Sequence, residues 1–149
     1  MANAVGKKIF EAEKAYLAGF LDADGAIMAI IEKHQEKKFG WRIRLVVKIT
    51  QNEPSILNYF LKKYKIGSVV KNRTTFDWLI RDQHSIVDLL KKTKPYLKIK
   101  NRQAQIALKI LSAKIKSKKD LIKIAYLADS LSRLNVRSRN RRLNFASMI

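Results

Sequence analysis

The first half of the chain changes from a helical to a strand-like arrangement of apolar residues. A helix is predicted from about Lys8 to Ala23, and Gly25 is expected to end it. Two strand-like stretches follow, Ala26 to His34 and Trp41 to Ile49. In the second stretch, apolar residues alternate with mostly cationic ones at a period of two. This pattern predicts a strand with one apolar face against a core and one cationic face away from it.

The rest of the chain repeats this order and then continues as helices. A second helix is predicted to begin near Pro54 with Asn52 as its cap, and Gly67 ends that unit. The further elements expected are a hairpin of Ser68 to Arg73 and Phe76 to Arg81, turning near Thr74 and Thr75, and helices from about His84 to Lys92, Asn101 to Ile115 and Asp120 to Leu134. The predicted fold class is α+β, in the order α-β-β-α-β-β-α with C-terminal helices. One domain is expected over residues 1–149, with a core of about 8–134 and a basic tail of 135–149.

Charge is the bulk property that points to a partner. The chain has 32 Lys and Arg against 12 acidic residues, a net charge of +20. Such an excess favours a polyanion, and nucleic acid first, because neutralised phosphates release counterions. A ribosomal protein, a binder of acidic membranes and a general lysine enrichment are the alternatives. The chain has no cysteine, which excludes disulfides, thiolate metal sites and cysteine catalysis.

The first helix carries small residues on one face and acidic residues at its end. Ala15, Gly19 and Ala23 are spaced four apart, so they form a stripe along which two backbones can approach closely. Since the chain has one such segment, a second copy is expected to supply the partner helix of a twofold dimer. Asp22 and Asp24 lie where the helix dipole is already negative, which calls for cations such as Mg²⁺. Asp22 is expected to bond to the backbone rather than to metal.

The segment that holds these residues also has a recognisable sequence. Leu17 to Gly25 reads LAGFLDADG and matches the LAGLIDADG signature at seven of nine positions; Phe20 and Leu21 depart from it and stay apolar. Ile49 to Gln51 and Lys94 to Lys100 are similar to further stretches of the same family. The chain therefore resembles the LAGLIDADG homing endonucleases of the single-motif, homodimeric class, over roughly residues 16–134. That resemblance implies a curved antiparallel DNA-binding sheet and metal-dependent cleavage of both strands of a long, roughly palindromic DNA site in intron homing.

The resemblance also assigns roles to particular residues. Asp24, Gln51 and Lys100 are expected to be catalytic: Asp24 as the metal ligand, assisted by the backbone carbonyl of Ala23, and the other two around the attacking water and the phosphate charge. Mg²⁺ is the expected ion, with Mn²⁺ as the alternative. Some relatives carry a further basic residue just after the Gln51 position, where this chain has Glu53, Pro54 and Ser55.

The cationic sheet face is expected to lie along the major groove of double-stranded DNA, where base edges can be distinguished. Its predicted members are Met28, Ile30, Glu32 and His34, then Arg42, Arg44, Val46 and Lys48, then Lys71, Arg73, Asp77, Leu79 and Arg81. Arg42, Arg44 and Arg73 are the candidates for bidentate contacts to guanine. A merely solvated strand face is the alternative interpretation.

Two other functions are compatible with the same residues. The chain resembles a family in which some members are RNA-binding intron maturases, and a non-catalytic DNA-binding module would keep the same fold. No apolar stretch approaches the roughly 20 residues that span a bilayer, so no membrane association is expected. The protein is expected to be soluble and intracellular, in an organelle (chloroplast or mitochondrion) or in a prokaryotic cytoplasm.

Overall fold

The computed structural model describes residues 4–135 and 145–149, so most of the predicted basic tail lies outside the described residues. The helices are α1 (Ala4–Asp24), α2 (Ser55–Tyr64), α3 (Gln83–Thr93), the 3-10 helix η1 (Lys94–Tyr96), α4 (Asn101–Ser112), α5 (Lys118–Asn135) and α6 (Phe145–Met148). The strands are β1 (Gly25–Lys33), β2 (Trp41–Gln51), β3 (Ser68–Asn72) and β4 (Thr75–Ile80). The predicted α+β class and the order α-β-β-α-β-β-α are confirmed.

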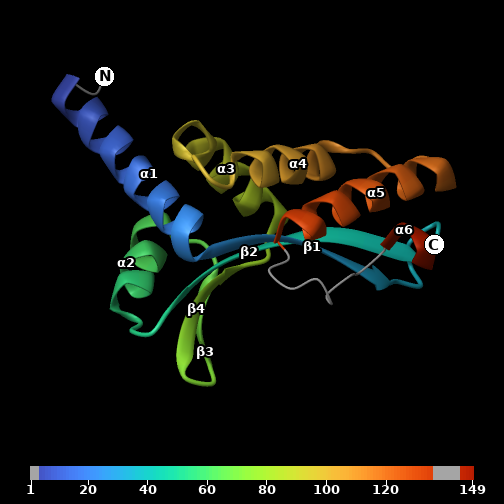
Figure 1. Cartoon of the computed structure of the whole chain (residues 1–149), viewed down its shortest axis with the longest axis horizontal. Coiled ribbons are helices and arrows are strands. Elements are labelled where there is room, and N and C mark those ends of the chain that lie inside the picture. Colours follow the sequence, from blue (N-terminus) through green and yellow to red (C-terminus); the bar gives the residue numbers. More distant parts are fainter. Residues whose placement is uncertain (1–3, 136–144) are drawn as a thin grey trace.

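The four strands form one antiparallel sheet in the order β1-β2-β4-β3. The β1–β2 pair is long, from Gly25 opposite Ile49 to Lys33 opposite Trp41. Helices α3, α4 and α5 cover one face of this pair, and none of the described helices covers the other, which is called the open face below (Figure 1). Helix α1 stands at the opposite end of the sheet from the β1–β2 turn, and its N-terminal half projects away from the body (Figure 1).

The core lies between the covered face of the sheet and the helices. It contains alternate residues of each long strand, as a period of two requires: Ile27, Ala29 and Ile31 from β1, Leu45, Val47 and Ile49 from β2, and Trp78 and Ile80 from β4. The Trp78 ring stacks on Phe60 with centroids 5.5 Å apart, and its indole N–H donates to the Ile66 carbonyl at 2.9 Å. The burial of the large rings between α2 and β4 fixes the second hairpin against the helices.

Element boundaries differ from the prediction where local hydrogen bonds decide them. Asn52 does not cap α2; Pro54 occupies the cap position, and no side chain bonds to the first turn. Helix α4 ends at Ser112, three residues before the predicted Ile115. The following helix begins early because the Asp120 carboxylate accepts from the backbone N–H groups of Lys116 and Ser117 at 3.0 and 3.1 Å.

The last described residues return to the body of the protein. The Asp129 carboxylate is almost fully buried and accepts from the backbone N–H groups of Phe145 and Ala146. Asn135 ends α5 and donates from its side chain to the Ile27 carbonyl at 2.6 Å. Of the predicted tail over 135–149, residues 136–144 lie outside the described residues, and these polar contacts hold Asn135 and the residues from Phe145 onward against the body. No helix in the described part of the chain is long and apolar enough to cross a membrane.

Substitutions at two glycines with positive φ can measure how tightly the chain packs against the second hairpin. Gly67 (φ 73°) and Gly40 (φ 77°) both have left-handed backbone, but a Cβ at Gly67 would collide with the Leu79 carbonyl oxygen, whereas one at Gly40 meets nothing within 4 Å. We expect Gly67→Ala to lower the free energy of unfolding by about 1–3 kcal/mol more than Gly40→Ala does, since both substitutions carry the same backbone strain. Urea unfolding of the two variants measures this difference, and equal losses would contradict the packing described.

Candidate active site and nucleic-acid interface

Helix α1 presents two different faces. Leu17, Ala18 and Leu21 are buried in the core. Ala15, Gly19 and Ala23 are exposed on the other face, so the stripe predicted from their spacing has no cover within the described part of the chain. A Cβ at Gly19 would meet nothing within 4 Å, and therefore the chain's own packing does not require glycine there.

The three residues of the stripe line a hollow of about 460 Å³, together with Tyr16, Phe20 and Asp24. Tyr16 is 51% exposed. Its ring packs edge-on against Phe20 with centroids 5.0 Å apart, and Phe20 packs in the same way on the buried Phe60 at 5.4 Å. Two aromatic rings, those of Tyr16 and Phe20, thus lie beside the exposed stripe, and the contact of Phe20 with Phe60 connects them to the core.

The end of this helix brings together two of the residues predicted to be catalytic. The Gln51 side chain donates from Nε2 to Oδ2 of Asp24 at 2.7 Å. The pairing of Gly25 with Ile49 explains this proximity, because it places the first residue after α1 beside the last residues of β2. Asp24 is exposed and Gln51 is half-buried, so the carboxylate is open to solvent.

Asp22 holds Lys100, the third residue predicted to be catalytic, at the end of α1. Its carboxylate accepts from the backbone N–H groups of Lys98, Ile99 and Lys100 at 2.8, 3.2 and 2.9 Å. The Lys100 ammonium donates to the backbone carbonyl of Asp22 at 2.6 Å. The expectation that Asp22 bonds to the backbone is confirmed, and the structure gathers Asp24, Gln51 and Lys100 around one helix end.

The donor set at this helix end suits a hard divalent cation. Asp24 offers an exposed carboxylate, while the Asp22 carboxylate is occupied by three N–H groups. Magnesium prefers oxygen ligands and retains several waters, so one carboxylate together with carbonyl oxygens and phosphates is a suitable set. The described residues contain no group of three or more His, Cys, Asp or Glu side chains that could hold an ion by themselves.

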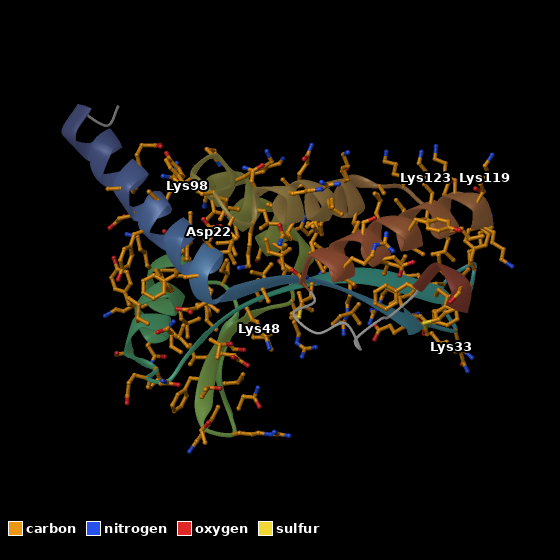
Figure 2. All side chains as sticks on the ribbon, viewed as in Figure 1. Asp22, Lys33, Lys48, Lys98, Lys119 and Lys123 are labelled. Atoms are coloured by element: carbon orange, nitrogen blue, oxygen red, sulfur yellow. The ribbon has the colours of Figure 1, made fainter. Side chains whose placement is uncertain are left out.

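The open face of the sheet carries most of the residues predicted to face DNA. Met28, Ile30, Glu32, Arg42, Arg44, Lys48 and Leu79 are half-buried there, on the strand positions that alternate with the core. The Lys48 side chain extends from the face that the helices leave uncovered (Figure 2). His34 begins the turn after β1, and its ring Nδ1 is shielded from solvent without a hydrogen-bond partner in the described part of the chain.

Two members of the predicted surface are buried rather than exposed. Val46, which pairs with Met28 of β1, is 2% exposed. Asp77 is 6% exposed, and its carboxylate accepts from the Thr50 hydroxyl at 2.5 Å and from the Asn72 amide at 3.4 Å. The structure thus buries two of the side chains that were predicted to face DNA.

The second hairpin departs further from the prediction. Lys71 pairs with Phe76, two residues from the buried Trp78, so its side chain belongs to the opposite face of the sheet from Asp77. Arg73 lies in the turn with φ 57° and not in a strand. Arg81 follows the end of β4 and is exposed.

The register instead places other residues of β3 on the open face. Ser68, Val70 and Asn72 are paired with Leu79, Asp77 and Thr75, which alternate with the core positions of β4. These three residues were missed. The stretch Ser68 to Asn72 has no alternation of apolar and polar residues, so its pairing with β4 was the signal needed to assign its faces.

A network of charges at the far end of the open face was missed as well. One oxygen of the Glu32 carboxylate, Oε1, accepts from Nε of Arg42 at 2.7 Å and also from Nη2 of the same side chain. Nε of Arg44 lies 3.4 Å from this oxygen. The hydrogen bond from Arg42 lowers the pKa of the Glu32 carboxyl. Glu32 is therefore an anion that links two cationic side chains.

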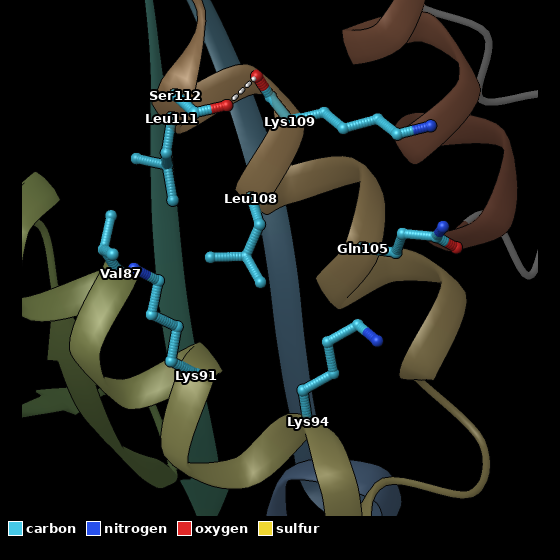
Figure 3. Close-up of a pocket in the computed structure, with 8 residues that line it drawn as sticks. All are labelled: Val87, Lys91, Lys94, Gln105, Leu108, Lys109, Leu111 and Ser112. Carbon is cyan, nitrogen blue, oxygen red and sulfur yellow. Dashed lines mark hydrogen bonds between the residues drawn. The ribbon is translucent and has the colours of Figure 1, made fainter.

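The helical side of the molecule is also basic. A groove between α3 and α4 has Val87, Leu108 and Leu111 on its walls, with Lys91, Lys94 and Lys109 among its other lining residues (Figure 3). Lys119 and Lys123 extend from α5 away from the sheet (Figure 2). Positive charge is thus not confined to the open face, and the groove contains none of the residues gathered at the end of α1.

Comparison with known proteins agrees with this arrangement. The model of the family described as LAGLIDADG endonuclease matches residues 17–107. DNA endonuclease I-CreI from Chlamydomonas reinhardtii is 30% identical over 126 residues, which cover 80% of this chain and 77% of that protein. DNA endonuclease I-CvuI from Chlorella vulgaris is 32% identical over 126 residues, covering 80% and 78%. The chain belongs to the LAGLIDADG endonuclease family.

Solved structures of homing endonucleases share the fold over more than nine tenths of this chain. The LAGLIDADG endonuclease I-CvuI, in complex with its target in the presence of 2 mM Ca, superposes with a TM-score of 0.83 at 28% identity and covers 95% of this chain and 92% of that one. The same relative, bound to the I-CreI target in 2 mM Mg with the DNA not cleaved, gives 0.82. An archaeal intron-encoded homing endonuclease in complex with DNA has the same fold at 18% identity, with a TM-score of 0.79.

The anchoring role of Asp22 in this LAGLIDADG chain can be measured without substrate. Asp22→Ala removes the acceptor of three backbone N–H groups, and we expect it to lower the free energy of unfolding by about 2 kcal/mol. Asp22→Asn keeps one accepting oxygen and should lose less. Asp88→Ala is the matched control: Asp88 is exposed on α3, and we expect a change within about 0.5 kcal/mol. Equal losses for the Asp22→Ala and Asp88→Ala variants in urea unfolding would contradict the anchoring role.

Proposed function

We propose that this protein is a homing endonuclease that cuts both strands of a long, roughly palindromic DNA site as a homodimer with divalent metal. The hydrogen bond between Gln51 and Asp24, at the exposed end of α1, carries this proposal. This bond holds the Asp24 carboxylate, which suits a cation, next to the Gln51 amide, which can orient water. The family to which the chain belongs and the names of its relatives, both DNA endonucleases, support the same activity.

The exposed stripe on α1 supports a dimer. Ala15, Gly19 and Ala23 are all exposed, and a twofold pairing of α1 with its copy would cover them. Small side chains let two helices approach closely, as in other small-xxx-small pairs. Asp24 lines the same hollow as the stripe, so the pairing would bring the two Asp24 carboxylates together near the axis. Their mutual repulsion makes cations necessary at that point.

The reaction adds water across the P–O3′ bond and leaves a 5′ phosphate and a 3′ hydroxyl. Asp24, with the backbone carbonyl of Ala23, would hold the divalent ion, for which Mg²⁺ is the first candidate and Mn²⁺ the second. Such an ion supplies activation of water and neutralisation of charge on the leaving oxygen. Gln51 orients the water by hydrogen bonding. Lys100, whose ammonium is held at the Asp22 carbonyl, places positive charge beside the phosphate.

The open face of the sheet supports the binding of double-stranded DNA. Arg42, Arg44 and Lys48 lie on this face, and an antiparallel ribbon of two strands fits the major groove. The net charge of +20 adds affinity for phosphates that is independent of sequence. Base contacts from the sheet then decide where along the DNA the helix ends meet the backbone.

Cleavage of a randomised library of DNA duplexes, with Mg²⁺ and with EDTA, tests the proposal as a whole. We expect a set of cleaved sites with inverted symmetry when Mg²⁺ is present, and no cleavage in EDTA. Binding without cleavage in either condition would favour a DNA-binding module. Preference for structured RNA over every duplex in a parallel binding assay would favour a maturase.

The role of Asp24 is testable by an isosteric substitution. Asp24→Asn removes the charge that holds the cation, and we expect the cleavage rate to fall by more than about 100-fold, since even residues that merely support a metal ligand contribute 10- to 100-fold. Affinity for the site should stay within a few-fold. Glu53→Gln, at an exposed carboxylate just beyond Gln51, is the control and should cut at the normal rate. Continued cutting by the Asp24→Asn variant removes this residue from the mechanism.

The role of the stripe is testable by its central residue. Because nothing in the part of the chain that the structure describes lies within 4 Å of a Cβ at Gly19, Gly19→Leu should leave the fold intact and separate the subunits. We expect the dimer dissociation constant to rise by at least about 100-fold, or roughly 3 kcal/mol. Asn58→Leu adds the same side chain on an exposed face of α2 and should remain a dimer. Sedimentation equilibrium measures both, and a folded wild-type monomer at high concentration would contradict the shared site.

A further inference from the structure

The network at the far end of the open face contains an acidic residue, Glu32, beside two arginines. Glu32 lies on β1 directly opposite Arg42 on β2, and diagonally from Arg44. The side chains of Glu32, Arg42 and Arg44 are 33%, 36% and 26% exposed. They are therefore accessible to a ligand, yet sheltered enough for the pairing to hold the side chains in place.

The hydrogen bonds occupy one particular edge of the Arg42 guanidinium. A guanidinium has two edges with paired N–H donors: a side edge of Nε and one terminal nitrogen, and an end edge of the two terminal nitrogens. Oε1 of Glu32 accepts from both Nε and Nη2, so the carboxylate holds the side edge. The end edge is the pair of donors that remains for a ligand with two adjacent acceptors.

In the major groove, guanine is the base that offers two adjacent acceptors, O6 and N7. We infer that Glu32 is a positioning residue for sequence recognition: it holds Arg42 by its side edge so that the end edge contacts guanine. This inference rests on the proposed binding of DNA. A carboxylate at this place also repels phosphates, so it disfavours the use of Arg42 as a contact to the DNA backbone, which carries no sequence information.

Arg44 supports the same assignment by contrast. Its Nε is shielded from solvent, makes no hydrogen bond within the described part of the chain and lies 3.4 Å from Oε1 of Glu32. Glu32 thus compensates the charge of Arg44 but orients the guanidinium of Arg42. The base preference that depends on Glu32 is for this reason assigned to Arg42.

The length of β2 gives the expected position of this guanine along the DNA site. Arg42 precedes Gln51 by nine residues of β2. At a rise of about 3.3 Å per residue this is about 30 Å, or about nine base pairs of B-DNA. The guanine is therefore expected about nine base pairs from the centre of the site, once in each half, because the dimer is symmetric.

Sequence profiles of the full-length protein test this inference. Libraries of duplexes randomised in the outer base pairs are selected by cleavage with the wild type and with the Glu32→Ala, Glu32→Gln and Glu36→Ala variants. We expect a guanine preference in the wild-type profile about nine base pairs from the centre, and a fall of roughly tenfold in that preference for Glu32→Ala, since a bidentate pair contributes about 1–3 kcal/mol of discrimination. Glu32→Gln keeps an accepting oxygen without the charge and should retain an intermediate preference.

Glu36 provides the matched control for charge. It lies exposed in the β1–β2 turn, so Glu36→Ala removes one negative charge from the same hairpin without touching either arginine. Both alanine variants should bind non-specific DNA more tightly by a similar factor. The loss of guanine preference should be confined to Glu32, and it should disappear when Arg42→Ala is the background, because the two residues act as one unit.

The outcomes separate this inference from the proposed function. A normal guanine preference in Glu32→Ala, an equal loss in Glu36→Ala, or a wild-type profile without guanine at that distance would overturn the positioning role and leave the endonuclease standing. A wild type that selects no DNA sequence would overturn both. If Glu32→Ala lowers the Tm of the protein, the isosteric Glu32→Gln variant tests the positioning role instead. An unchanged guanine preference in that variant, with an unchanged Tm, also overturns the role.

Discussion

Three backbone N–H groups of residues 98–100 converge on the Asp22 carboxylate, and this interaction fixes the end of α1 relative to the rest of the chain. On one side of that end the chain enters β1 at Gly25, where a Cβ would lie 2.6 Å from the Leu21 carbonyl oxygen. On another side Asp24 meets Gln51 at the end of β2. The helix end therefore cannot shift without disturbing the sheet, the loop before α4 and the candidate catalytic residues together.

In the proposed dimer, helix α1 packs against two different partners. Leu17, Ala18 and Leu21 serve the core, and a rigid core is what holds the small residues on the opposite face in a straight, open row. The acidic end of α1 is unfavourable for the helix dipole, and it would be more so with a second copy nearby. That local conflict marks the end of α1 as a place for function rather than stability, and the cations of the proposed function would relieve it.

Much of the fold could be predicted from the sequence, because apolar and mostly cationic residues alternate along β2 and the core needs that alternation. The helix end could be predicted as well, since the spacing of Ala15, Gly19 and Ala23 and the two aspartates define it locally. The faces of the β3–β4 hairpin could not: Ser68 to Asn72 has no periodicity, so the assignment of Lys71 failed where pairing with β4 decides. Likewise, the contact between Glu32 and Arg42 depends on strand register, which no local pattern contains.

A disulfide cross-link tests directly whether two α1 helices lie close together in the dimer. The chain has no cysteine, so one introduced at Ala23 is the sole thiol of each subunit. A disulfide requires Cα atoms within about 7 Å. We expect Ala23→Cys to form a covalent dimer rapidly that still binds DNA, and Lys14→Cys, on the other side of the same helix, to form none. No cross-link at position 23, or equal cross-linking at both positions, would contradict this expectation.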